Sequence, residues 1–227
     1  MEHKILKIVE IIDSNPVLFD IFRSCPYEIL YYWNIKEYPA GTILCHQGEI
    51  IDNLNIIVDG FIDIYFTREN GKRYNIATHK CGGFIGEMEF FEKKPFVCSV
   101  EAYTDLTVLE IKRDHFLKWV AEDRNISSYV IKVLSREFYD YSHKAGNDIL
   151  YPLKVRICSY LLSRSKQLST KIIKINKEKL SEELAVTTRS IHRILHDLQS
   201  KNIIEVKTDV IIVKDLDKLA SEDENVR

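Results

Sequence analysis

The 227-residue sequence contains no run of 18 or more apolar residues, and its start lacks a basic segment followed by an apolar stretch. The first absence excludes a membrane-spanning helix, and the second gives no sign of a secretory signal. Apolar content of 45% and charged content of 29% are ordinary for a globular protein. We therefore expect a cytoplasmic protein, long enough for two domains that each have a core.

Cysteine is scarce, and its spacing fits none of the common cysteine-based sites. No Cys-x-x-Cys pair occurs, which excludes the usual zinc-finger and iron–sulfur arrangements. An odd number of cysteines also argues against a complete disulfide framework. We expect reduced thiols, mostly buried, at Cys25, Cys45, Cys81, Cys98 and Cys158.

Short β segments separated by turns fill the region from Asn34 to Lys112. Seven of the eight glycines lie between positions 41 and 86, where they mark closely spaced turns. Phe61–Phe66 and Tyr74–His79 flank Asn70-Gly71, a dipeptide that strongly indicates a hairpin. This pattern predicts a double-stranded β-helix of the jelly-roll type, preceded by short helices within residues 1–33.

Jelly-roll domains also contain the metal site of some dioxygenases. That site needs two histidines at alternate strand positions with a carboxylate beyond them. His46-Gln47-Gly48 is the nearest candidate, and it lacks the second histidine. No P-loop, Gly-x-Ser-x-Gly or His-Glu-x-x-His motif occurs either. We therefore expect no enzyme activity, no catalytic residue and no bound metal.

A long helix is predicted from Arg113 to about Asn147, because no proline occurs there and no glycine precedes Gly146. Its broad apolar stripe needs to be covered. One side can lie on the β domain and the other can meet a second copy in a coiled-coil-like homodimer. The alternative is a helix packed entirely within the monomer. The residues assigned to the dimer helix are Ile126, Val130, Val133, Leu134, Phe138 and Tyr141.

Two short helices with a tight turn between them are predicted within Lys177–Gln199. Leu180 and Leu184 lie on one face of the first helix, and Thr187 is a suitable N-cap for the second. Helices of this size joined by so short a turn are the signature of a helix-turn-helix. The alternative is an ordinary amphipathic helix pair in a helical domain.

Polar side chains cover the outer face of the second helix, and β segments follow it. Ile203–Val206 and Val210–Val213 flank a short turn and predict a small wing. Hydroxyl, imidazole and guanidinium groups are suited to DNA phosphates and base edges. The residues expected to contact DNA are Thr187, Thr188, Arg189, Ser190, His192 and Arg193.

Charge is distributed unevenly along the chain. Residues 154–214 contain 13 Lys and Arg against 6 Asp and Glu, a local net charge of +7. Because the whole chain carries −2, the remaining residues carry −9. Such asymmetry indicates that the basic part binds a polyanion, and this part contains the helix pair.

A glycine-rich β-roll, a long helix and a winged helix-turn-helix together resemble the Crp/Fnr transcription regulators over nearly the whole chain. Phe84–Phe91 is similar to the Gly-Glu-containing phosphate-binding cassette of cyclic-nucleotide domains. Gly146–Ile157 is similar to the hinge and first helix of the DNA-binding domain, and Thr187–Ile204 to the recognition helix and following strand. The resemblance implies an α+β fold, double-stranded DNA as partner and a homodimer.

The effector pocket departs from the cyclic-AMP-binding members of that family. In those members an Arg-Ser pair follows the cassette and holds the phosphate; Phe96 and Val97 stand here. A buried phosphate without that counter-charge would cost several kcal/mol. Cyclic-nucleotide binding is therefore disfavoured. The pocket would hold an apolar or neutral ligand, or be filled by Phe96, Val97 and Cys98. The pocket residues assigned by the resemblance are Gly86, Glu87, Phe96, Val97, Cys98, Tyr141 and Ser142.

The reading helix departs as well. Many members of the family carry Glu at the position of Arg189, where a carboxylate accepts from a cytosine amino group. An arginine favours guanine or a phosphate instead, so we expect a half-site that differs from the common one. Arg193 matches the usual basic residue one turn later, and His192 adds a further donor.

These features predict three segments. Residues 1–112 form N-terminal helices and a sensor-type β-roll, 113–147 the connecting and dimerisation helix, and 148–227 the winged helix-turn-helix. The predicted function is a homodimeric regulator that binds a palindromic operator, with RNA polymerase as a candidate partner. No cofactor is expected, and the effector is not identified by the sequence. The alternative is a sensor or interaction module that uses the β-roll alone and binds no DNA.

Overall fold

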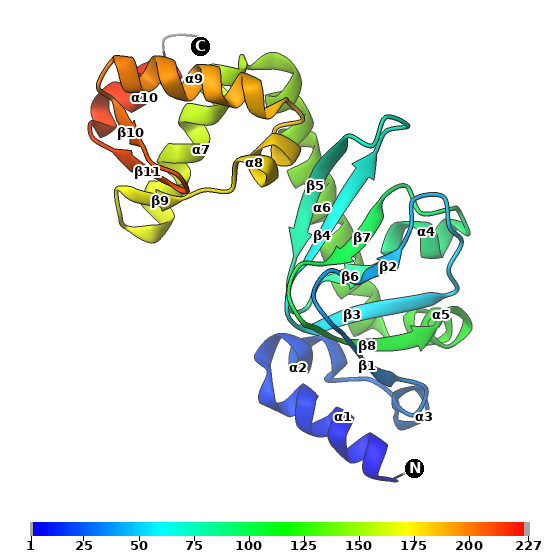
Figure 1. The fold of residues 1–227 in the computed structure, drawn as a ribbon. Helices are drawn as coiled ribbons and strands as arrows, with labels where there is room; N and C mark the ends of the chain where they lie inside the picture. Colours follow the sequence, from blue (N-terminus) through cyan, green and yellow to red (C-terminus); the bar gives the residue numbers. More distant parts are fainter. Residues whose placement is uncertain (1, 225–227) are drawn as a thin grey trace. The chain divides into compact units, whose positions relative to one another are not determined.

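The computed structural model describes residues 2–224, which form two compact units (Figure 1). Unit 1 comprises Met1–Gly71 and Asn75–Tyr139, and unit 2 comprises Lys72–Tyr74 and Asp140–Arg227. Each unit has its own hydrophobic core. The long helix α6 (Arg124–Leu150) contributes its first part to unit 1 and its last turns to unit 2.

Three helices open unit 1: α1 (Glu2–Ser14), α2 (Pro16–Phe22) and α3 (Tyr27–Leu30). Asn15 separates the first two, because its side chain accepts a hydrogen bond from the Val17 backbone N–H at 3.0 Å and caps α2. Pro16 then occupies the first turn, where its missing N–H costs nothing. The sequence predicts this break at Pro16.

Two four-stranded antiparallel sheets make the β-roll. One sheet has the order β1-β8-β3-β6 and the other β2-β7-β4-β5, so every pair of neighbouring strands except β4 and β5 is distant in sequence. This is the jelly-roll arrangement expected from the sequence. The strands are β1 (Asn34–Tyr38), β2 (Ile43–Cys45), β3 (Asn53–Asp59), β4 (Ile62–Thr67), β5 (Arg73–His79), β6 (Phe84–Ile85), β7 (Ser99–Ala102) and β8 (Leu106–Lys112).

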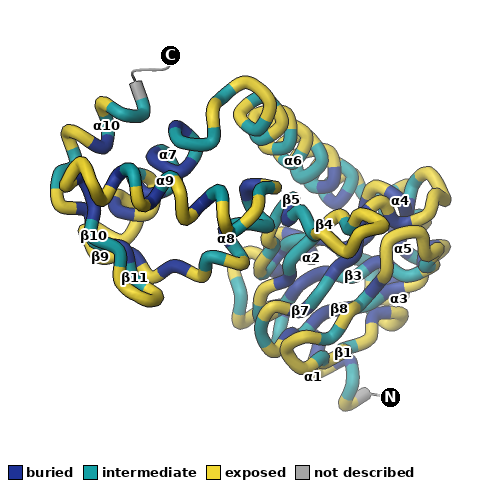
Figure 2. The backbone as a smooth tube through the Cα atoms, turned by 45° about the horizontal axis from the view of Figure 1, so that its top comes forward, coloured by how far each residue is buried: buried dark blue, intermediate teal, exposed yellow. Residues whose placement is uncertain are grey.

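Unit 1 contains two apolar clusters. The first joins β3 and β8 to the N-terminal helices and contains Trp33, Phe116 and Trp119 in edge-to-face contact. The second fills the roll and contains Ile57, Ile62 and Val100. In Figure 2 these strands are largely buried, whereas exposed residues recur along α6.

The predicted single helix 113–147 is wrong, because two helices occupy the region. α5 (Arg113–Glu122) ends at Asp123, whose backbone is extended at φ −116° and ψ 112°. The Asp123 carboxylate accepts from the Asn125 backbone N–H at 2.8 Å and from the Trp119 indole at 2.8 Å. Asp123 thus starts α6 as an N-cap, and α6 continues through Gly146 to Leu150.

Unit 2 is a winged helix-turn-helix. Its elements are α7 (Leu153–Leu168), β9 (Ile172–Lys174), α8 (Lys177–Glu183), α9 (Thr188–Ser200), β10 (Ile204–Val206), β11 (Val210–Val213) and α10 (Leu216–Glu224). The three strands form one antiparallel sheet in the order β10-β11-β9. Ile157, Leu161, Ile191 and Leu195 lie at the centre of its core. Helix α10 was not predicted by the sequence.

Candidate nucleic-acid interface and effector pocket

Helix α9 has one apolar face and one polar face. Ile191, Leu195 and Leu198 are buried in the core of unit 2 at helical spacing. Thr187 is the N-cap, as predicted, and its hydroxyl accepts from the Ser190 backbone N–H at 3.2 Å. The apolar face fixes the rotation of α9 about its axis, so that the opposite face points outward.

The outward face presents cations that have no partner. Arg189, His192 and Arg193 are exposed, whereas Thr188 and Ser190 are half-buried. Within residues 2–224, neither Arg189 nor Arg193 forms a hydrogen bond or an ion pair through its side chain. Arginines that are free of carboxylates keep all their donors for phosphate oxygens or guanine edges.

The turn between α8 and α9 is short and contains one residue with left-handed backbone angles. Ala185 adopts φ +55°, a conformation that favours glycine, so this position carries backbone strain. The Ser181 hydroxyl donates to the Val186 carbonyl at 2.6 Å, and the Val186 N–H bonds back to the Ser181 carbonyl at 3.1 Å. These bonds hold the turn closed.

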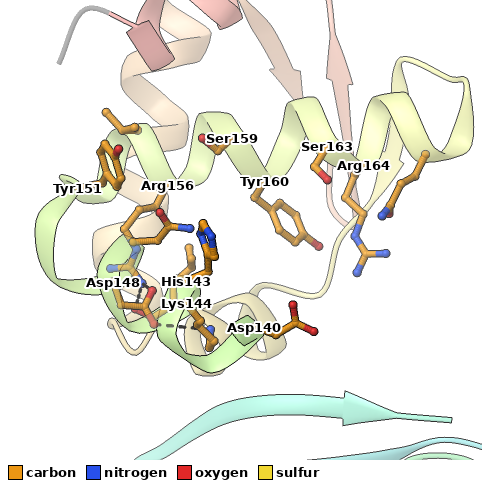
Figure 3. A pocket seen from close by; sticks show the side chains of 14 residues that line it. Asp140, His143, Lys144, Asp148, Tyr151, Arg156, Ser159, Tyr160, Ser163 and Arg164 are labelled. Carbon is orange, nitrogen blue, oxygen red and sulfur yellow. Dashed lines mark hydrogen bonds and ion pairs between the residues drawn. The ribbon is translucent and has the colours of Figure 1, made fainter. Parts of the chain in front are cut away.

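A charged network joins the last turns of α6 to the end of α8 (Figure 3). Arg156 pairs with Asp148 and donates to the Leu184 carbonyl at 2.8 Å. Lys144 lies 3.6 Å from Asp148 and donates to the Glu183 carbonyl at 3.0 Å. Both cations thus cap the C-terminal carbonyls of α8, where positive charge is stabilising.

A groove of about 670 Å³ lies beside this network within unit 2. The last turns of α6, the exposed face of α7 and Leu184 form its walls. Tyr160 and Arg164 lie away from the network, with the guanidinium 5.5 Å from the Tyr160 ring centre (Figure 3). Its acidic and basic groups are mixed, so the groove favours no charge class of ligand.

The effector pocket expected from the resemblance is occupied by Phe96. Gly86 starts α4 (Glu87–Glu92) at φ +88°, and a Cβ placed there would lie 2.7 Å from the Phe96 ring. The Phe96 side chain is 6% exposed and belongs to the core of the roll together with Ile57 and Val108. The ring therefore packs directly under the cassette glycine that precedes α4.

Val97 and Cys98, the other two residues expected to fill the pocket, differ in burial. Val97 is 55% exposed, so the idea that it helps to fill the pocket is wrong. Val97 lies in a bend just before β7, and this bend leaves its side chain exposed while Phe96 and Cys98 are buried. Cys98 is buried, and burial raises the pKa of its thiol to about 11. Tyr141 and Ser142 belong to unit 2, where Tyr141 is half-buried and Ser142 is exposed.

The carboxyl of Glu87 makes a contact that was not predicted from the sequence. Its carboxyl is 5% exposed and forms a hydrogen bond with the carboxyl of Glu137 on α6. Burial and then the Glu137 charge raise the pKa of Glu87 well above its ordinary value. The raised pKa favours the protonated form of Glu87 beside Glu137. The Glu137 Oε2 atom is buried, and no hydrogen-bond partner is found for it among the described residues.

Two further groups lie around this pair. His79 Nε2 is 3.7 Å from Glu137 Oε1, and both side chains are largely buried. Glu89 Oε1 accepts from the Val97 backbone N–H at 3.0 Å. Glu137 lies seven residues after Val130 and thus on the same face of α6, but the sequence did not show that this face turns toward the chain's own core.

The cassette helix is held from its far end by a buried arginine. Arg113 donates to the carbonyls of Phe90 at 2.6 Å and Phe91 at 3.1 Å. Its guanidinium also lies 5.6 Å from the Phe90 ring centre. These bonds satisfy carbonyls at the end of α4, so this cation is committed to structure and not directed to a ligand.

The predicted dimer stripe on α6 needs correction. Ile126 and Val130 are buried in the core of unit 1 against their own chain, so their assignment to a dimer interface is wrong. Leu134 packs on the same core, and Val133 and Tyr141 are half-buried. Of the six assigned residues, only Phe138 is exposed, at 75%.

The geometry defines a class of protein: a winged helix-turn-helix joined by a long helix to a β-roll of the cyclic-nucleotide-domain type. Two family models match the chain in the same order. One is described as a cyclic nucleotide-binding domain and matches residues 35–123. The other is described as a Crp-like helix-turn-helix domain and matches residues 155–222. Together they cover more than half of the sequence.

Several known proteins are similar over most of their length. The cAMP-activated global transcriptional regulator CRP of Salmonella typhimurium is 28% identical over 191 residues, which are 81% of this chain and 91% of that protein. The CRP-like cAMP-activated global transcriptional regulator of Mycobacterium tuberculosis is 21% identical, over 81% of this chain and 85% of that protein. Both are transcription regulators.

Solved structures share the fold at low identity. A transcriptional regulator of the crp/fnr family from Eubacterium rectale has a TM-score of 0.75 at 16% identity, over 93% of this chain and 99% of that one. The c-di-GMP responsive regulator CLP of Xanthomonas campestris has a TM-score of 0.72 at 18% identity, over 81% and 94%. The chain belongs to the Crp/Fnr family of transcription regulators and carries its DNA-binding domain.

In the part of the chain that the structure describes, no helix combines the length and apolarity needed to cross a bilayer.

Proposed function

We propose that the protein is a homodimeric transcription regulator that reads a palindromic operator with α9 and does not respond to cyclic nucleotides. The observation that carries this proposal is the outward face of α9, where Arg189 and Arg193 have no intramolecular partner. Its relatives are regulators and not enzymes, and we propose the same for this chain. A protein of this kind acts in the cytoplasm, where its DNA lies.

A dimer is supported by an exposed stripe on α6. Residues at alternating spacings of three and four are exposed along the whole helix, which is the spacing of a coiled-coil seam. Ile131 and Phe138 on this stripe are 64% and 75% exposed. A second copy would bury them, with small residues between the large ones. The stripe consists of Ser128, Ile131, Ser135, Phe138, Ser142, Ala145 and Ile149.

A two-fold dimer determines the form of its operator. Two copies of α9 would read half-sites one helical turn apart, about 34–36 Å, on one face of the duplex. Arg189 favours guanine O6 and N7 or a phosphate over a cytosine amino group. We therefore expect a half-site that differs from the one read by relatives with Glu at this position.

Independence from cyclic nucleotides is supported by the packing of the pocket. The Phe96 ring fills the space beneath Gly86, and the Glu87 carboxyl is bonded to Glu137. A cyclic nucleotide would have to displace the ring, break the carboxyl pair and bury its phosphate without a counter-charge. The chain therefore fills its own pocket: its side chains occupy the space that a bound ligand would need.

The experiment is to select a DNA sequence with the purified protein and to measure binding to the selected and to a random duplex. Arg193→Ala should lose ~1–3 kcal/mol of discrimination if Arg193 reads a guanine. Equal weakening on both duplexes would show that Arg193 touches only phosphate. Gln199→Ala, near the other end of α9, is the matched control. Adding cyclic AMP should change neither affinity, and a large gain would refute the self-filled pocket.

A further inference from the structure

A second hollow lies in unit 1, outside the β-roll pocket and the DNA-binding unit. It has a volume of about 410 Å³ and opens between the end of α2 and the first two turns of α6. Donor groups dominate its lining. The lining residues are Asp20, Arg23, Arg124, Asn125, Ser128, Tyr129 and Lys132.

Arg23 is held in place by its neighbours. Its Nε donates to the side-chain oxygen Oδ1 of Asn125 at 2.7 Å, and its Nη1 lies 3.3 Å from the Asp20 carboxylate. The Asn125 amide donates in turn to the Asp20 backbone carbonyl at 3.3 Å. The guanidinium is therefore oriented between α2 and α6, and its remaining N–H groups are not used by these contacts.

The other donors of the hollow are unused. Across residues 2–224, Arg124 and Lys132 form no ion pair, and the hydroxyls of Ser128 and Tyr129 form no hydrogen bond. Burial and then the Asp20 charge raise the pKa of Tyr129, so this hydroxyl keeps its proton and can donate. Asp20 supplies the one carboxylate of the lining, and it is already paired with Arg23.

The charge of this hollow is opposite to that of its surroundings. Residues 1–139 contain 16 Lys and Arg against 21 Asp and Glu, so this part of the chain is acidic overall. Three of those cations line the hollow with a single carboxylate, which gives it a local charge of +2. Because Asp20 already pairs with Arg23, it leaves the charges of Arg124 and Lys132 uncompensated, and these repel one another unless an anion neutralises them.

We propose that this hollow is a binding site for a small phosphate-bearing anion. Guanidinium groups form paired hydrogen bonds with phosphate oxygens, and the Lys132 ammonium adds a point charge. The Tyr129 hydroxyl completes the set of donors around the phosphate. The site joins α2 to α6 and is independent of the Phe96 pocket, so an anion bound here would tie the long helix to the N-terminal helices.

The test measures binding of inorganic phosphate and of glycerol phosphate to the full chain by calorimetry, with chloride at equal ionic strength as the reference. Both phosphates should bind with one site per chain, and preference for the ester would identify an organic phosphate as the ligand class. Arg124→Gln and Lys132→Gln should each weaken binding about tenfold, the value of one lost charge-assisted hydrogen bond.

Lys7→Gln is the matched control, because Lys7 is exposed on α1, away from the lining of the hollow. It should leave phosphate affinity unchanged. Equal weakening in Lys7→Gln would mean that phosphate only screens surface charge, and this would overturn the proposal. Phosphate binding no stronger than chloride binding would also overturn the proposal. A phosphate affinity that falls as protein concentration rises would overturn it too, because it would show that a second copy fills the hollow.

Discussion

Replacing Phe96 by alanine tests directly whether the chain fills its own effector pocket. The ring is 6% exposed and packs with Ile57 and Val108 in the core of the roll, beneath Gly86. Removing a buried phenyl ring usually costs about 3–5 kcal/mol, because both its burial and its packing contacts are lost. We expect a value in this range, since the glycine backbone and the flanking sheets leave little room for collapse.

The assay is urea unfolding followed by tryptophan fluorescence, since Trp33 and Trp119 lie in the adjoining core. Val97→Ala is the matched control and should cost less than about 0.5 kcal/mol, because Val97 is exposed. Cyclic AMP should not restore the stability of Phe96→Ala, because the cavity contains no counter-charge for the phosphate. A Phe96→Ala cost as small as that of Val97→Ala would refute the reasoning.

Three other predictions concern α6 and its contacts. Because the folded pKa of Glu87 is raised, its contribution to stability is present below its ordinary value of 4.5 and is lost as pH rises through the folded pKa. Glu137→Gln should therefore flatten the fall in unfolding free energy with rising pH, and an unchanged slope would exclude the carboxyl pair as its cause. Asp148→Asn should destabilise unit 2 by roughly 1–3 kcal/mol, because it leaves the largely buried Arg156 without its anion. Backbone hydrogen exchange should accelerate in α8 first. Uniform acceleration across unit 2 would contradict a local role for the Asp148–Arg156 pair. The double variant Ile131→Ser, Phe138→Ser should sediment as a monomer. The control Leu6→Ser alters a similarly exposed apolar residue on α1 and should leave the dimer intact. A double variant that stays dimeric would place the interface elsewhere.

Local signals predicted the DNA-binding unit well. The cap at Thr187, the apolar spacing from Ile191 to Leu198 and the wing strands are each determined by neighbouring residues, and the structure contains all of them. The break between α5 and α6 at Asp123 also has a local cause, because aspartate is a strong N-cap. The prediction of one continuous helix missed this break, because it relied on the absence of glycine and proline.

Long-range packing accounts for what the sequence did not predict. An apolar stripe on α6 does not say which of its residues face the chain's own core and which face outward, and Ile126 and Val130 proved to face the core. Likewise, the contact between Glu87 and Glu137 joins residues 50 positions apart on separate elements. Neither can be deduced from periodicity alone.

The most direct test of the central claim compares binding to a selected palindrome with binding to a single half-site over a range of salt concentrations. A dimer that reads DNA with two copies of α9 should bind the palindrome far more tightly. Its affinity should fall steeply as salt rises, because both copies release counterions from phosphates. Equal affinity for the palindrome and the half-site, or affinity independent of salt, would contradict a dimeric DNA reader.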